Sequence, residues 1–312
     1  MNRNLPASVR QRLMNKAKET GRPFQEVLQY FAMERFLYRL SQSRHADKFV
    51  LKGAVMFKVW GGSPSRPTKD IDFLARMDNA VAPVVAVVSE VCGQAVEADG
   101  LDFDVASVTG AVITKDADYS GVRVTFLVTL QNARVSMQID MGFDDVVTPT
   151  PTMSEYPALL DFPAPRLLGY PRETVVAEKF EAMTKLGQLN SRMKDFYDLW
   201  VLSRRFDFNG ATLASAIQRT FAHRKTAVVS LPTALTSVFS GDASKQMQWQ
   251  GFVRRTRLDA VPNSLESLID DLVPFLVPVW LQQSKPARPS TNSGQQQVLG
   301  DQLELRRGSV DP

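Results

Sequence analysis

Apolar side chains at helical spacing occur near the start of the sequence and again over most of its second half. Residues 6–20 and 23–41 repeat apolar positions three and four apart, a spacing that predicts two helices. The apolar stretch 79–92 predicts a third helix, with Asp78 as its N-terminal cap. The same spacing recurs over residues 173–282, so this part of the chain is also predicted to be helical.

Alternation of apolar and polar residues marks two segments in the middle of the chain. "GVRVTFLVTL" (121–130) and "RVSMQIDMGF" (134–143) each place apolar side chains on one face. Only "QNA" separates them, so they predict a β-hairpin. Residues 149–172 are rich in proline and irregular, which predicts a domain boundary. The inward-facing positions of the hairpin are predicted to be Val122, Val124, Phe126, Val128, Leu130, Val135, Met137 and Ile139.

Two aspartates interrupt a short apolar segment, "RPTKDIDF" (66–73). If residues 68–73 form a strand, Thr68, Asp70 and Asp72 point to one face, while Ile71 and Phe73 point to the other. One face then packs in the core and the other presents two carboxylates. A lone Asp-x-Asp is also common where a strand end faces solvent, so the pair alone does not define a site.

A third aspartate, Asp140, lies on the polar face of the second hairpin strand. Carboxylates that converge from neighbouring strands repel one another unless cations lie between them. Hard oxygen ligands of this kind suit Mg²⁺ or Mn²⁺. Two such ions are a common device for displacing pyrophosphate from a nucleotide. Asp70, Asp72 and Asp140 are therefore the candidate metal ligands.

Composition narrows the possible chemistry. A chain of 312 residues with 44% hydrophobic content can bury the core of one large domain or two ordinary ones. Its single cysteine, Cys92, and its two histidines leave little material for a zinc site, so a bound metal is expected to have oxygen ligands. No apolar run is typical of a membrane span or a signal peptide, which favours a cytoplasmic protein that needs no membrane.

Charge is unevenly distributed along the chain. Residues 1–60 carry 12 Lys and Arg against 4 Asp and Glu, whereas residues 61–160 carry 6 against 14. Residues 161–312 carry 19 basic against 15 acidic side chains. An acidic centre between basic flanks suits a cation site beside surfaces that attract a phosphate-bearing partner, although charge blocks are often only solvated surface.

Five segments follow one another in a fixed order: "FVLKGA" (49–54), "RPTKDID" (66–72), "QIDMGFDD" (138–145), "RETVVAEKFEAM" (172–183) and "NSRMKDFYDLW" (190–200). Together they resemble the nucleotidyltransferase AbiEii/AbiGii toxin family. This family supplies the toxin of many type IV toxin–antitoxin and phage-defence modules. The resemblance implies an α+β fold, in which a polymerase-β-like nucleotidyltransferase core with a mixed sheet precedes a helical C-terminal domain.

The resemblance also implies a domain plan and an activity. Residues 1–160 would hold the N-terminal helices and the core, and residues 161–282 a helical domain that completes the active site. The polar, proline-bearing tail 283–312 is predicted to be disordered. The implied activity is metal-dependent transfer of NMP from an NTP to a cellular RNA, with tRNA ends as acceptor in the MenT branch. The implied partners are NTP, RNA and an antitoxin encoded nearby.

The resemblance assigns further roles residue by residue. Lys179 would bind the triphosphate, and Asp195, with Asp198 as second choice, would belong to the catalytic site. Lys179 lies within an apolar stripe of its predicted helix, so its ammonium group needs an anionic partner or a route to water. A lysine that merely reaches solvent is the alternative account.

The phosphate-binding segment departs from the family pattern. The usual signature has Gly followed by Gly or Ser, whereas this chain has Gly53-Ala54, so a hydroxyl contact is missing. The backbone at Gly53 can still cradle phosphate, with Lys52 adding charge. Arg66 and Thr68 complete the nucleotide-binding candidates, and the Thr68 hydroxyl is also a candidate for phosphorylation or nucleotidylation.

Two other functions fit the same residues. A glycosyltransferase of the Asp-x-Asp type would use the carboxylates to hold the metal of a nucleotide sugar, but it leaves Lys179 and Asp195 without a task. A catalytically dead protein that binds a partner through the same fold is the other alternative.

Overall fold

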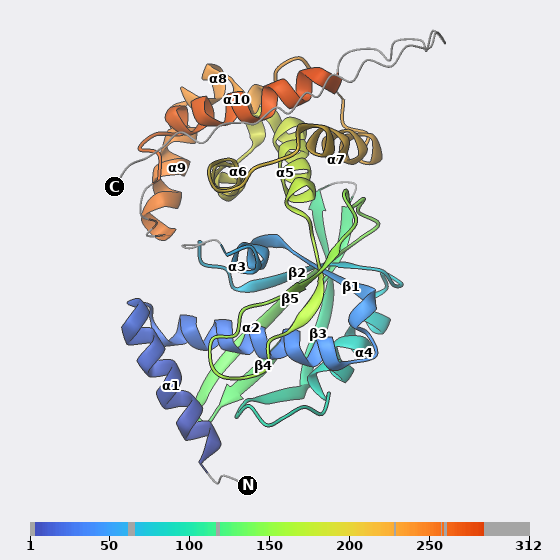
Figure 1. Ribbon diagram of the computed structural model, residues 1–312, viewed down its shortest axis with the longest axis vertical. Coiled ribbons are helices and arrows are strands. Elements are labelled where there is room, and N and C mark those ends of the chain that lie inside the picture. Colours follow the sequence, from blue (N-terminus) through green and yellow to red (C-terminus); the bar gives the residue numbers. More distant parts are fainter. Residues whose placement is uncertain are drawn as a thin grey trace, which may run out of the picture. The chain divides into compact units, whose positions relative to one another are not determined.

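The computed structural model describes residues 4–61, 66–116, 119–227, 229–256, 258 and 261–283. The chain divides into two compact units (Figure 1). The first unit comprises Met1–Asp145 and Pro151–Tyr170, and the second comprises Val146–Thr150 and Pro171–Pro312. The boundary expected after residue 160 falls inside the first unit, and residues 284–312 of the predicted tail lie outside the described residues.

A seven-stranded mixed sheet forms the centre of the first unit. Its strand order is β3-β4-β5-β2-β1-β7-β6. Strand β2 pairs in parallel with β5, and β1 pairs in parallel with β7, while the other pairs are antiparallel. The strands are β1 (Phe49–Lys52), β2 (Asp70–Ala75), β3 (Asp102–Asp116), β4 (Tyr119–Leu130), β5 (Ala133–Phe143), β6 (Thr152–Glu155) and β7 (Arg166–Gly169).

Three long helices accompany this sheet. Helices α1 (Leu5–Thr20) and α2 (Phe24–Gln42) confirm the two predicted N-terminal helices, and α2 contacts β5 and β7 (Figure 1). Helix α4 (Val81–Cys92) packs against β3 and β4. The predicted cap of α4 is wrong, because Asp78 Oδ1 accepts a hydrogen bond from the Ala80 amide and the helix begins one residue later. A short helix, α3 (Met56–Val59), follows β1.

The predicted hairpin is confirmed as β4 and β5. Leu130 pairs with Ala133 at the turn, and every predicted inward-facing side chain is buried. The prediction for residues 149–172 was incomplete, because this segment contains β6 and β7. Strand β7 pairs in parallel with β1, so Val50 lies opposite Leu168.

Helices build the second unit, as predicted. Its core includes the side chains of Phe180, Phe196, Phe221 and Trp249. The predicted α+β class, a mixed sheet with helices C-terminal to it, is therefore confirmed. None of the helices that the structure describes is both long and apolar enough to cross a membrane. The helices are α5 (Arg172–Leu186), α6 (Met193–Arg205), α7 (Gly210–His223), α8 (Ser237–Ser240), α9 (Ala243–Thr256) and α10 (Leu265–Gln283).

Candidate active site

Strand β2 carries the two carboxylates of the Asp-x-Asp pair near the middle of the sheet. Ile71 and Phe73 are buried, while Asp70 and Asp72 are half-buried on the opposite face. In the parallel register with β5, Asp72 lies beside Asp140. The alternation proposed for this segment is therefore correct from Asp70 onward. Thr68 precedes the strand, so the expectation that it belongs to the strand is wrong.

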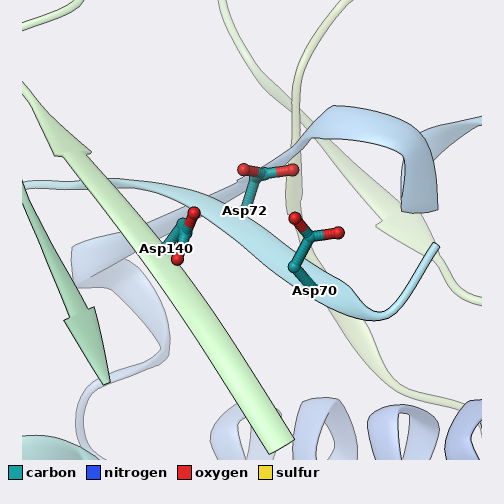
Figure 2. A group of neighbouring side chains, drawn as sticks. All are labelled: Asp70, Asp72 and Asp140. Carbon is teal, nitrogen blue, oxygen red and sulfur yellow. The ribbon is translucent and has the colours of Figure 1, made fainter. Parts of the chain in front are cut away.

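The three aspartates form one cluster. One carboxylate oxygen from each of Asp70, Asp72 and Asp140 lies within 4.8 Å of the others. Figure 2 shows the three side chains gathered over β2 and its neighbouring strand. Asp140 is only 3% exposed. The parallel pairing of β2 with β5 produces this convergence, because equivalent positions of the two strands point to the same face.

Arg123 holds the third carboxylate, a role that was not predicted from the sequence. Arg123 lies opposite Asp140 in the β4–β5 register. Its Nε donates to Asp140 Oδ1 and its Nη2 to Asp140 Oδ2, both at 2.8 Å. These hydrogen bonds raise the pKa of Arg123 above its usual value. Counting residues back from the tight turn of the hairpin would have predicted the pairing.

Gly53 lies against the cluster. It directly follows β1, where Lys52 pairs with Asp72. Its φ of 75° lies in the left-handed region, and a Cβ at this position would be 2.1 Å from Asp72 Oδ2. Glycine is therefore required on two grounds, conformation and space. The side chain of Ala54, where the family pattern has Gly or Ser, is buried.

Lys52 forms an ion pair with another carboxylate of the first unit. Its Nζ lies 2.6 Å from Asp145 Oδ2, and the Asp145 side chain is only 2% exposed. The Nζ also lies 5.4 Å from the ring centroid of Tyr170. Asp145 belongs to the "QIDMGFDD" segment, but nothing in the local pattern distinguished it from Asp144.

The other nucleotide-binding candidates precede β2. The Thr68 hydroxyl donates to Asp70 Oδ1 at 2.6 Å, so it orients the first carboxylate of the pair. Arg66 is half-buried in the irregular segment before the strand. Thr68 thus belongs to the carboxylate cluster through a hydrogen bond and not through strand alternation.

The second unit contains a separate charged group on α5 and α6. Lys179 Nζ lies 2.6 Å from Asp195 Oδ1 and 2.9 Å from Asp198 Oδ2. The side chains of Lys179, Asp195 and Asp198 are 15%, 9% and 2% exposed. The sequence left open whether Lys179 has an anionic partner or a route to water, and the structure pairs it with both candidate aspartates.

The carboxylate cluster fits a divalent cation on the chemistry of its donors. All three ligand candidates offer carboxylate oxygen, the donor that Mg²⁺ and Mn²⁺ prefer. Asp70 and Asp72 come from one strand and share one face, so they can bind one ion together. Both oxygens of Asp140 accept hydrogen bonds from Arg123, so its access to an ion depends on that arginine.

The fold and the cluster together define the class of protein. A mixed sheet presents an Asp-x-Asp pair beside a glycine turn, and the neighbouring parallel strand supplies the third carboxylate. This is the arrangement expected of a nucleotidyltransferase. Residues 35–271 match the family model described as "Nucleotidyl transferase AbiEii toxin, Type IV TA system". The match covers well over half of the chain, so the chain belongs to this family, and the predicted family is confirmed.

Two solved structures from Helicobacter pylori are similar to the chain at 16% sequence identity. One is a nucleotidyltransferase candidate, with a TM-score of 0.47 over 83% of this chain and 96% of that one. The other is JHP933, with a TM-score of 0.48 over 83% of this chain and 95% of that one. No curated protein matches the chain.

Proposed function

We propose that this protein transfers NMP from an NTP to a cellular RNA, with the 3′ end of tRNA as the acceptor. Membership of the family supports nucleotidyl transfer and a toxin role in a toxin–antitoxin pair. The observation that carries the proposal is the cluster of Asp70, Asp72 and Asp140 beside Gly53. The acceptor, the metal requirement and the site residues are part of the proposal.

Asp70 and Asp72 would hold Mg²⁺ or Mn²⁺, with Asp140 as the third ligand. A bound ion would supply Lewis acidity at the reacting phosphate and offset charge on the leaving pyrophosphate. Thr68 keeps Asp70 oriented through its hydrogen bond. Because Gly53 has no Cβ, the Asp72 carboxylate can lie against the glycine turn, and backbone N–H groups of the turn would bind phosphate oxygens beside it.

Basic side chains would bind the triphosphate. Both Lys52, directly before the glycine turn, and Arg66, in the irregular segment before β2, belong to the first unit. Lys179 in the second unit would contribute a further ammonium group, oriented by its two aspartates. Asp195 would position Lys179 or accept a proton from the attacking hydroxyl group.

The RNA acceptor is inferred from charge and family. Residues 1–60 have an excess of basic side chains, and the whole chain has a formal net charge of +4. Such surfaces attract nucleic acid through phosphate contacts, and the binding is sensitive to salt. A cognate antitoxin is the implied protein partner, and the cytoplasm, where tRNA and NTP are found, is the proposed location.

Transfer of label tests this function directly. The purified protein is incubated with each α-labelled NTP, Mg²⁺ and total tRNA, and the RNA is resolved on a gel. We expect label in tRNA from at least one NTP, and none after Asp72→Asn. Asp78→Asn, which changes a carboxylate outside the cluster, should transfer label normally.

Two results would contradict the proposal. Label transferred from UDP-sugars, and from no NTP, would identify a glycosyltransferase that uses the same carboxylates. If no donor transfers label and a partner encoded nearby still binds, the protein is catalytically dead.

A further inference from the structure

Arg123 lies next to the carboxylate cluster but has no role in the proposed function. It lies on β4, directly opposite Asp140 on β5. Its guanidinium group forms two hydrogen bonds with the two oxygens of Asp140, each 2.8 Å long. A planar fork of this kind matches a carboxylate better than a lysine would, and the charge strengthens both hydrogen bonds.

Asp140 and Arg123 differ in how far their side chains are exposed to solvent. The Asp140 side chain is 4% exposed, whereas the Arg123 side chain is 40% exposed. Asp140 is held in place by its strand and also accepts a hydrogen bond from Gln138 Nε2 at 3.3 Å. Arg123 has solvent on its outer side, so its long side chain can turn away without leaving a buried cavity.

An ion shared by the three aspartates would compete with Arg123. Oxygens of Asp70, Asp72 and Asp140 lie within 4.8 Å of one another, close enough to bind the same cation. Each oxygen of Asp140 already accepts a hydrogen bond from Arg123, and Oδ1 accepts a second one from Gln138. A cation that approaches this carboxylate therefore meets the guanidinium charge and competes with it for the lone pairs of Asp140. The arginine and the cation each supply the positive charge that the cluster requires.

We propose that Arg123 is an internal cation that competes with the divalent metal for Asp140 and so lowers the metal affinity of the free site. The inference rests on the proposed function, because it concerns the same metal ligands. When the guanidinium group leaves Asp140 it becomes available to a phosphate group, which it can bind through the same planar fork. Binding of a phosphate-bearing ligand by Arg123 and binding of metal by Asp140 are then coupled, and each favours the other.

Metal binding in the absence of nucleotide tests this role. Mn²⁺ is titrated into the wild-type protein and into Arg123→Gln, and free Mn²⁺ is followed by electron paramagnetic resonance. We expect Arg123→Gln to bind Mn²⁺ about 10-fold more tightly, since the ion no longer competes with the guanidinium charge for Asp140. The gain should disappear in the double variant Arg123→Gln/Asp140→Asn. Arg134→Gln, which removes an exposed positive charge from β5, is the matched control and should bind as the wild type does.

Three results would overturn the inference. Unchanged or weaker binding by Arg123→Gln would mean that Arg123 does not compete, or that it prepares Asp140 for the metal. An equal gain in Arg134→Gln would mean that only overall charge matters. Absence of Mn²⁺ binding in every variant would also exclude it. Circular dichroism spectra establish that each variant is folded.

The inference and the proposed function can fail separately. If tRNA receives no label but Arg123→Gln still gains Mn²⁺ affinity through Asp140, the proposed function is wrong, while the competition between Arg123 and the metal is supported. If tRNA is labelled and Arg123→Gln gains no Mn²⁺ affinity, only the proposed competition is wrong.

Discussion

Gly53 is the residue whose replacement most directly tests the carboxylate cluster. A Cβ at this position would lie 2.1 Å from Asp72 Oδ2 and would require a φ of 75°. We expect Gly53→Ala to abolish nucleotidyl transfer, because Asp72 must move to make room. The left-handed conformation alone costs a non-glycine residue about 1–2 kcal/mol. Transfer assays and urea unfolding measure the two effects.

Gly21 provides the matched control. It has a φ of 65° at the end of α1, and a Cβ there would meet nothing within 4 Å. Gly21→Ala should therefore show the conformational cost of about 1 kcal/mol without loss of activity. Full activity in Gly53→Ala would mean that the geometry of Asp72 is not needed for the reaction.

Lys179 tests the charged group of the second unit. Lys179→Met keeps the apolar part of the side chain but leaves Asp195 and Asp198 without its ammonium group. Removing one partner of a buried ion pair typically costs about 3–5 kcal/mol, so the free energy of unfolding should fall by that order. Transfer should also be lost. Adding Asp195→Asn and Asp198→Asn should restore much of the stability but none of the activity.

The opposite result for Lys179 would also be informative. If Lys179→Met unfolds at the same urea concentration as the wild type and still transfers label, the ion pairs of Lys179 with Asp195 and Asp198 contribute neither to stability nor to the reaction.

At the residue scale, the sequence predicted which side chains carry the chemistry better than it predicted how the strands pair. Alternation placed Asp70, Asp72 and Asp140 on polar faces, and the structure brings them together. Lys179 was expected to need either an anionic partner or a route to water, because it interrupts an apolar stripe. Arg123 was missed because its importance depends on the register of two strands, which no single segment displays.

At the element scale, helix α2 buries a carboxyl group whose ionisation should influence stability. Glu34 is fully buried, and its Oε2 accepts a hydrogen bond from the Leu159 amide at 2.6 Å. Burial raises the pKa of Glu34 to about 7 from an ordinary value of 4.5. Lys58 and Arg35 are the nearby cations that partly oppose this shift.

The sign of the pH effect follows from that rise. Protonated Glu34 is favoured in the folded state, so its contribution to stability is complete below about pH 4.5 and is lost as the pH rises through about 7. The loss is on the order of 3 kcal/mol. Glu34→Gln keeps an acceptor for the Leu159 amide and should not show this loss, so urea unfolding from pH 4.5 to 8 should separate the two proteins.

An exposed glutamate of α1 provides the control for this series. Glu19→Gln should follow the wild-type pH profile, because its side chain is largely exposed. Profiles of wild type and Glu34→Gln that remain parallel over the whole range would show that Glu34 does not change its protonation in this window.

Elements with long periodic patterns were predictable, whereas the four-residue strands β6 and β7 were not. Helices α1 and α2 and the hairpin of β4 and β5 each have enough repeats to reveal their period. Strands β6 and β7 have four residues each and lie in a proline-rich segment, so no alternation could emerge. The parallel pairing of β7 with β1 joins residues far apart in sequence, and such pairing leaves no local signal.

At the scale of the whole molecule, the proposed catalytic groups belong to two units with separate cores. Asp70, Asp72 and Asp140 lie in the first unit, while Lys179 and Asp195 lie in the second. If all of them act on one nucleotide, as the proposed function requires, ligand binding must depend on both units. A ligand at 100 times its dissociation constant stabilises a protein by about 2.7 kcal/mol.

This dependence predicts how ligand raises the melting temperature of the full chain. NTP with Mg²⁺ should raise it for the wild type, and either Asp72→Asn or Lys179→Met should abolish the rise, each compared with its own ligand-free form. Lys185→Met, which changes an exposed lysine of α5, should retain it. If Lys179→Met keeps the full rise, the nucleotide binds to the first unit alone. Lys179 would then have no part in binding the triphosphate, and the family-based role given to the second unit would be wrong.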